Sequence, residues 1–222
     1  MAGARYVNLG DPPAGSITQR YRYSWFLLSL IAMIVLAPIV ERADVASIAY
    51  QILFTVVALL ALNVATDRRS HLVVAAACAV SWLILDWAGF LTGQTGFQIP
   101  AGIAFICLLF VVLYDILLLL LQVRRADLDV LSAAVAAYLL LGVAWATSFD
   151  MIERTLPGSF DGLNSERWSE FLYFRMTTLT TVGYGDVTPA NPIAGIWATL
   201  EAACGVLYIA VLIARLVALV RD

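Results

Sequence analysis

The chain has 222 residues and a formal net charge of −3; 62% of the residues are hydrophobic and only 13% are charged. A soluble domain carries about 25% charged residues, and a disordered chain is poorer in apolar residues, so both classes are excluded. The composition therefore indicates an integral membrane protein with several spans, embedded in a lipid bilayer. No basic cluster with interleaved aromatic residues indicates a nucleic-acid partner.

Residues 1–23 are polar, contain a Pro-Pro-Ala-Gly break and are predicted to form a cytoplasmic N-terminal segment. Six apolar runs follow, each of about 17 to 29 residues, close to the roughly 20 residues with which a helix crosses a bilayer. They cover residues 24–40, 45–65, 72–91, 99–123, 128–149 and 192–220. We therefore predict an all-α membrane protein with six transmembrane helices, the first four of which form a four-helix domain over residues 24–125.

The arginines predict the orientation of these helices. If the N-terminus is cytoplasmic, nine arginines lie in inner segments and three in outer segments, which is the bias that the positive-inside rule expects. The inner ones are Arg5, Arg20, Arg22, Arg68, Arg69, Arg124, Arg125, Arg215 and Arg221, and the outer ones are Arg42, Arg154 and Arg167. Both termini are then expected to be cytoplasmic, with the protein in the plasma (inner) membrane.

Residues 150–191, between the fifth and sixth runs, differ in character. A polar loop over 150–167 precedes an aromatic-rich stretch, 168–178, that is predicted to be a short helix, and a run dense in Gly and Thr follows. Non-helical backbone at membrane depth must be buried in protein or line a water-filled cavity, because lipid offers its polar groups no partners. The segment is therefore predicted to be re-entrant, within a pore domain over residues 126–222.

The run Thr180-Thr181-Val182-Gly183-Tyr184-Gly185-Asp186 fits the needs of a dehydrated K⁺. Such an ion gives up its water only if several oxygens replace it, and backbone carbonyls form stacked rings when consecutive residues alternate in backbone handedness. The two glycines reach positive φ without steric cost. Thr181 adds its hydroxyl, while Val182 and Tyr184 are expected to point outward and brace the strand against the short helix.

One chain supplies one wall of each ring, so four chains around an axis, a homotetramer, are expected. The string contains the TVGYG loop of K⁺-channel selectivity filters, and residues 128–220 resemble the potassium-channel superfamily, specifically its small bacterial members with an ion-channel pore domain. The resemblance implies that the permeant K⁺ binds at Thr181, Val182, Gly183 and Tyr184, with Gly185 completing the filter. No organic cofactor is implied.

The family carries an aromatic cuff around the filter, and Tyr173 and Phe174 occupy the corresponding positions. The spacing of Tyr173 and Asp186 is the one at which the family joins cuff and filter, so we predict a hydrogen bond between them at the outer mouth. Aromatic packing alone is the alternative. Thr177 stands where some relatives keep an acidic residue behind the filter, and this departure argues against carrying over their carboxylate-pair inactivation mechanism.

Two further charges are expected at membrane depth near the filter. Arg175 in the short helix needs a partner there. Glu201 in the sixth span is the predicted counter-ion, in a buried ion pair, and Glu170 is a competing one nearer the outer surface.

The sixth run is long enough to extend beyond the hydrocarbon into the cytoplasm. Gly205 lies in its middle, at the position that resembles the gating hinge of the family; close helix packing is the alternative. An apolar stripe at helical intervals follows, made of Val206, Ile209, Ile213 and Val217. The stripe is predicted to line the cavity and close it by dewetting, or instead to pack on the fifth span.

Six spans with a pore between the last two resemble the architecture of voltage-gated channels. A voltage sensor needs about three to four regularly spaced Arg or Lys residues in its fourth span, and the fourth run here has none. Its one charge is Asp115, and Asp86 lies near the outer end of the third run. Both are candidates for sensing a ligand, ion or proton; the alternative is that each is protonated or hydrogen-bonded to a neighbouring helix.

The short link after the fourth run favours packing of each four-helix domain against its own pore domain.

The sequence therefore predicts a K⁺-selective passive channel that is not gated by a standard voltage sensor. The alternative is a regulatory or poorly conducting subunit that needs a separate polypeptide for gating, since no cytoplasmic sensing domain is expected after Val220. An enzyme is not indicated, because no nucleophile is paired with a base and no phosphate-binding loop is present.

Overall fold

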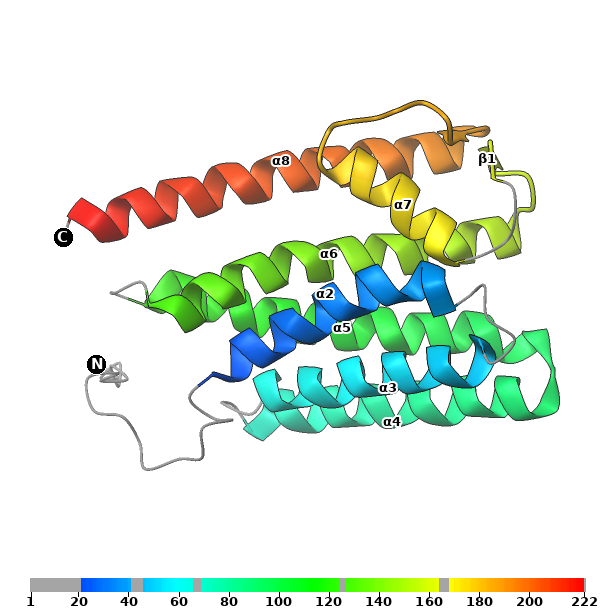
Figure 1. The fold of residues 1–222 in the computed structure, drawn as a ribbon, viewed down its shortest axis with the longest axis horizontal. Helices are drawn as coiled ribbons and strands as arrows, with labels where there is room; N and C mark the ends of the chain where they lie inside the picture. The colour runs from blue at the N-terminus through cyan, green and yellow to red at the C-terminus, as the bar shows by residue number, and fades with distance from the viewer. Residues whose placement is uncertain (1–20, 41–45, 66–68, 124–126, 164–167, 222) are drawn as a thin grey trace.

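A computed structural model describes residues 21–40, 46–65, 69–123, 127–163 and 168–221, so most of the predicted N-terminal segment lies outside the described residues. The long helices are α2 (Arg22–Val40), α3 (Ala46–Val64), α4 (Arg69–Thr92), α5 (Gln98–Gln122), α6 (Leu128–Thr155) and α8 (Pro192–Arg221), with the short α7 (Trp168–Leu179) between the last two. A 3-10 turn, η2 (Thr95–Phe97), precedes α5, and two short strands are β1 (Phe160–Asp161) and β2 (Thr188–Pro189). Successive long helices run in opposite directions, so α2 begins and α8 ends at the same end of the molecule (Figure 1).

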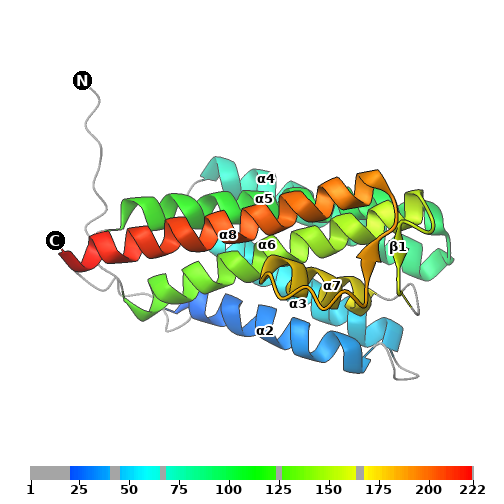
Figure 2. The same cartoon turned by 90° about the horizontal axis from the view of Figure 1, so that it is seen from above.

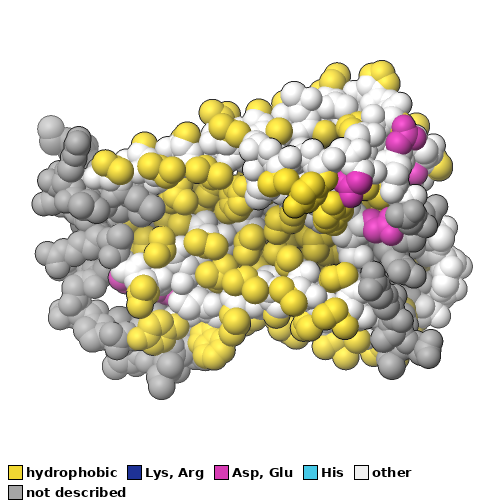
Figure 3. Space-filling model, turned by 45° about the horizontal axis from the view of Figure 1, so that its top comes forward, with side chains coloured by type: hydrophobic (Ala, Val, Ile, Leu, Met, Phe, Trp, Pro, Cys, Tyr) yellow, Lys and Arg dark blue, Asp and Glu magenta, His cyan; other side chains and the backbone are white. Residues whose placement is uncertain are grey.

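Five of the described helices are long and apolar enough to cross a membrane: α2, α4, α5 with η2, α6 and α8. The apolar part of α3 is shorter, over Gln51–Val64, so a sixth crossing stays a prediction. Apolar side chains cover the middle of the face shown in Figure 3, and acidic ones gather near the end that carries β1. The molecule is thus a multi-pass helical membrane protein.

Helix α6 forms the centre of the molecule, between the first helices and the re-entrant segment (Figures 1 and 2). Its most apolar stretch is 61% buried, against 17% for α8. Small residues make this possible, because Ala133, Ala134, Ala136 and Ala137 are all fully buried and let neighbouring helices approach closely. Helix α8, in contrast, leaves most of its apolar surface open to lipid or to other chains.

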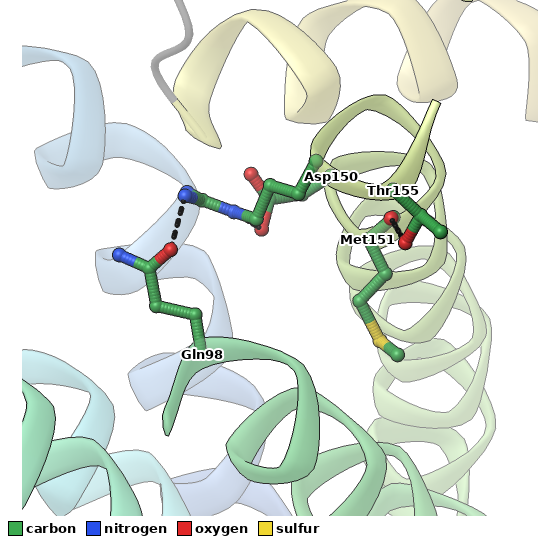
Figure 4. Close-up of polar contacts among 5 residues, drawn as sticks. Gln98, Asp150, Met151 and Thr155 are labelled. Atoms are coloured by element: carbon green, nitrogen blue, oxygen red, sulfur yellow. Dashed lines mark hydrogen bonds and ion pairs between the residues drawn. The ribbon is translucent and has the colours of Figure 1, made fainter. Parts of the chain in front are cut away.

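Two arginines of later helices bind α5, one at each end of that helix. At the start of α5, Arg154 of α6 donates to Gln98 Oε1 at 2.7 Å (Figure 4), and it also donates to Asp150 Oδ2 of its own helix at 2.7 Å. At the end of α5, Arg215 of α8 donates to the carbonyls of Leu120 and Leu121 at 3.1 Å and to that of Val123 at 2.6 Å. The carbonyl end of a helix carries partial negative charge, so a cation is favourable there.

Hydrogen bonds also join helix α2 to the start of α6. The amide and hydroxyl of Ser24 donate to Asp129 Oδ1 at 3.0 and 2.9 Å. The Asp127 side chain caps α6 by accepting from the Val130 amide at 2.8 Å. The first four helices therefore pack on the pore region of their own chain, the arrangement expected from the short link, although link residues 124–126 lie outside the described part.

Candidate functional site

The chain reverses direction after α7, which runs from the end of the molecule that carries β1 to about the middle of α8 before the backbone returns to that end (Figure 1). Two amides of the returning strand bind one carbonyl: Val182 N and Gly183 N donate to Thr177 O at 2.8 and 3.1 Å. No peptide bond of the described residues is cis, and in a trans peptide the N–H and C=O groups point in opposite directions. The carbonyls of Thr181 and Val182 therefore point away from α7.

Backbone handedness alternates along this segment. Thr181, Gly183 and Gly185 have φ of +61°, +52° and +77°, whereas Val182 and Tyr184 do not have positive φ. The glycines take the conformation expected of them. Sequence reasoning missed Thr181, a β-branched residue in the left-handed region; such a conformation costs on the order of 1–3 kcal/mol and persists only where surroundings enforce it.

The outward side chains are largely uncovered in the single chain. Tyr184 is 70% exposed and stacks on Tyr173 with ring centroids 6.3 Å apart and planes 5° from parallel. Val182 is 53% exposed. The stacking on Tyr173 of α7 fits the prediction that Tyr184 braces the strand against the short helix, and for Val182 this bracing stays a prediction.

The predicted link between Tyr173 and Asp186 is present. The Tyr173 hydroxyl donates to Asp186 Oδ2 at 2.7 Å. This hydrogen bond lowers the pKa of the Asp186 carboxyl and, as the main cause, raises the pKa of Tyr173 to about 12. Phe174 packs with ring centroids 5.4 Å from both Phe149 and Phe160, in an aromatic cluster between α6, β1 and α7, and its place in a cuff stays a prediction.

A clamp of backbone contacts on residues 186–190, after the glycine-punctuated strand, was missed from the sequence. Strand β1 pairs antiparallel with β2, and Ala190 N donates to Ser159 O at 2.8 Å. Gly162, with φ of +87°, lies so close to the Asp186 carbonyl that an added Cβ would overlap it. Two-residue strands give no periodic signal, and only the glycines of the 150–167 loop hinted at a tight approach.

Arg175 and Glu201 are both fully buried. The three guanidinium nitrogens and the two carboxylate oxygens have no hydrogen-bond partner among the described residues. The direct ion pair expected from the sequence is therefore not formed. The guanidinium instead lies against Gly142 of α6, whose missing side chain leaves room for it.

Gly205 also serves close packing. A Cβ there would overlap the Leu179 carbonyl at the end of α7, and Tyr138 donates its hydroxyl to the same carbonyl at 3.1 Å. This contact supports the packing alternative, and the hinge stays a prediction. The stripe after Gly205 is about half uncovered in the single chain, with 53%, 41%, 56% and 49% exposure for Val206, Ile209, Ile213 and Val217, and its role in lining a cavity stays a prediction.

The two intramembrane carboxylates have neighbours on other helices. Asp115 Oδ1 of α5 contacts His71 Nδ1 of α4 at 2.5 Å. Asp86 of α4 lies near the Gln51 side chain of α3. The Asp115–His71 contact fits the alternative in which the carboxylate bonds to a neighbouring helix, and the role of Asp86 stays a prediction.

A short helix and a glycine-punctuated strand thus lie between the long helices α6 and α8, in the order expected from the sequence resemblance. Residues 134–222, which begin within α6 and continue through α8, match the model of a family described as "Ion channel".

Two curated relatives each match a part of the chain. The chain is 38% identical over 72 residues to the inward rectifier potassium channel Kirbac3.1 of Paramagnetospirillum magnetotacticum, covering 32% of this chain and 22% of that protein. It is 33% identical over 88 residues to two pore potassium channel c of Oryza sativa subsp. japonica, covering 39% of this chain and 18% of that protein. The matched segment thus spans about a fifth of the length of these relatives.

Proposed function

We propose that this protein is a K⁺-selective channel in which four chains surround one pore and residues Thr181 to Gly185 form the filter. The observation that carries the proposal is the backbone of this strand. Its amides bind Thr177 O, its handedness alternates, and the carbonyls of Thr181 and Val182 turn away from their own helix. Oxygens arranged in this way can replace the hydration shell of K⁺ when four strands face one another.

The exposed surfaces support a tetramer. Tyr184 and Val182 are large side chains that remain open at the end of an otherwise packed pore region. The apolar stripe of α8 is open as well, and in a tetramer it lines the cavity below the filter. Exposed apolar surface of this kind marks contact with other chains or with lipid.

Gating is proposed to be independent of a voltage sensor. Helix α5 carries no Arg, Lys or His between Gln98 and Gln122, and its one charge, Asp115, is engaged by His71. The apolar stripe is the proposed gate and Gly205 the proposed hinge. The gating stimulus is proposed to act through the four-helix domain, with Asp86 and Asp115 as candidate sensing groups, or through a separate regulatory polypeptide.

The test is flux through the full chain purified and reconstituted in liposomes. A K⁺ gradient should drive passive flux, Na⁺ should fail to replace K⁺, and cross-linking should give a tetramer. Gly183→Ala should abolish K⁺ over Na⁺ discrimination, because φ of +52° disfavours any side chain. Gly195→Ala is the matched control, since a Cβ there meets open space. Intact discrimination in Gly183→Ala, or a monomer, would contradict the proposal; a selective tetramer that stays shut alone would favour the regulated-subunit alternative.

A further inference from the structure

A buried polar cluster lies where α6, α7 and α8 meet. Its members are Arg175 of α7, Glu201 of α8 and Tyr138 of α6. Arg175 and Glu201 are 0% exposed, and none of their five charged-group nitrogen and oxygen atoms has a hydrogen-bond partner among the described residues. Burying a charge without hydrogen bonds is costly, so these atoms need a partner that completes them.

The cluster has a space shaped for the guanidinium. Gly142 follows Tyr138 by four residues and so lies on the same face of α6. A Cβ at Gly142 would overlap the Arg175 guanidinium, which therefore fills the volume that any larger residue would occupy. The Tyr138 hydroxyl is within electrostatic reach of both charges.

The cluster also adjoins the backbone that holds the filter. Tyr138 donates to Leu179 O, the last residue of α7, and this carbonyl rests against Gly205, one turn after Glu201. Arg175 lies two residues before Thr177, whose carbonyl binds the Val182 and Gly183 amides. A displacement of α7 relative to α8 would thus move the carbonyl on which the filter strand hangs.

We propose that Arg175 and Glu201, linked through ordered water, are a positioning pair that fixes α7 between α6 and α8 and so sets the spacing of the filter carbonyls. Opposite charges on facing helices attract strongly where the dielectric constant is low. A buried water typically makes about three hydrogen bonds, and it can bridge polar atoms that are too far apart to bond directly. The inference rests on the proposed channel function and adds residues that act on the filter without contacting the ion.

A double-mutant cycle in the reconstituted full chain tests the pair. Arg175→Gln and Glu201→Gln each leave one buried charge unpaired, and each should lower the K⁺/Na⁺ permeability ratio about tenfold. The double variant removes both charges and should recover most of the ratio, as should the conservative Arg175→Lys. Single variants with the wild-type ratio, or a double variant worse than either single one, would overturn the proposal.

Gly142→Ala tests the geometry without changing any charge. The new methyl group displaces the guanidinium, so the permeability ratio should fall as it does in Arg175→Gln. Gly195→Ala, the glycine with open space around it, is the control and should leave the ratio unchanged. An unchanged ratio in Gly142→Ala counts against a positioning role.

Water-edited NMR on arginine-labelled protein tests the link itself. The guanidinium signal that disappears in Arg175→Gln should receive magnetisation from water despite its burial. If this Arg175 signal of the wild-type protein receives no magnetisation from water, the water link is overturned.

The outcome for the pair can be separated from that for the channel. If the wild type is K⁺-selective and the variants match it, the positioning pair fails and the proposed function stands. If the wild type does not discriminate K⁺ from Na⁺, the proposed function fails. Thermal unfolding of the wild type, the two single variants and the double variant then tests the pair. If the two charges are coupled, both single variants should have a lower midpoint of thermal unfolding, and the double variant should recover it.

Discussion

The two halves of the proposed pore region are held in different ways. The half that carries β1, the proposed outer half, is bound to itself by short polar contacts: the Tyr173–Asp186 bond, the two amides on Thr177 O and the β1–β2 pairing. After Gly205, α8 donates side-chain hydrogen bonds through Tyr208, to Ala134 O at 2.6 Å, and through Arg215, to the end of α5. In the proposed channel, the first half is therefore a fixed region suited to selecting an ion, whereas the end of α8 is suited to moving. Arg215 links this end of α8 to the four-helix domain.

Gly162→Ala should break the outer half, with the largest effect. Gly158 and Gly162 both have positive φ, so an alanine at either costs about 1–2 kcal/mol. Only at Gly162 does the new Cβ overlap the Asp186 carbonyl, which adds about 1–3 kcal/mol of overpacking. Thermal unfolding should therefore show a larger loss for Gly162→Ala than for Gly158→Ala, accompanied by reduced K⁺/Na⁺ discrimination. Equal losses would mean that the clamp does not hold the filter segment.

Arg215→Gln should loosen the inner half. Hydrogen bonds from a charged group are worth about 1.5–3 kcal/mol, so losing those to the end of α5 should shift the gating equilibrium about tenfold away from the present conformation. Single-channel recording would show this as a changed open probability at unchanged selectivity. Arg154→Gln, which cuts the outer tie of α5, is the matched control and should leave the open probability near its wild-type value. Equal shifts in both variants would contradict a role specific to the inner end.

Tyr173→Phe should have a smaller effect, on the outer mouth alone. The hydroxyl is solvent-exposed, so its bond to Asp186 is partly replaced by water, and we expect no more than about a threefold change in selectivity or filter stability. Tyr114→Phe, an exposed tyrosine on α5, serves as the control. A complete loss of selectivity in Tyr173→Phe would show that the single bond, and not the whole clamp, holds the mouth.

The sequence predicts those features that follow from length and local backbone chemistry. The fourth apolar run, 99–123, corresponds to α5 over Gln98–Gln122, because bilayer thickness fixes the length of a spanning helix. Gly183 and Gly185 take positive φ for the reason that makes glycine suitable there. The hydrogen bond between Tyr173 and Asp186 could be predicted because their spacing is the one found in the family that the sequence resembles.

The features that the sequence did not reveal depend on tertiary neighbours. Arg215 binds backbone carbonyls, and carbonyls are present at every residue, so its acceptors carry no sequence signal. Gly142 is one of several glycines in helices, and only the approach of Arg175 gives it a role. The same holds for Arg175 and Glu201, whose charges suggested a direct pair, while the helix positions leave their polar atoms apart.

The smallest expected effect is the pH dependence of the outer mouth near neutrality. Hydrogen bonding lowers the pKa of Asp186 from its usual 3.8, so the stability that this bond contributes is fully present above that value and lost as the pH falls through the lowered one. For Tyr173, the pKa is raised from 10.0 to about 12, so its contribution is present below 10 and lost as the pH rises toward 12. The difference in stability between wild type and Tyr173→Phe should therefore be constant from about pH 5 to about pH 9 and shrink in strong acid or base. A difference that changes within that range would show that the Tyr173–Asp186 bond is not what sets the pH dependence of the outer mouth.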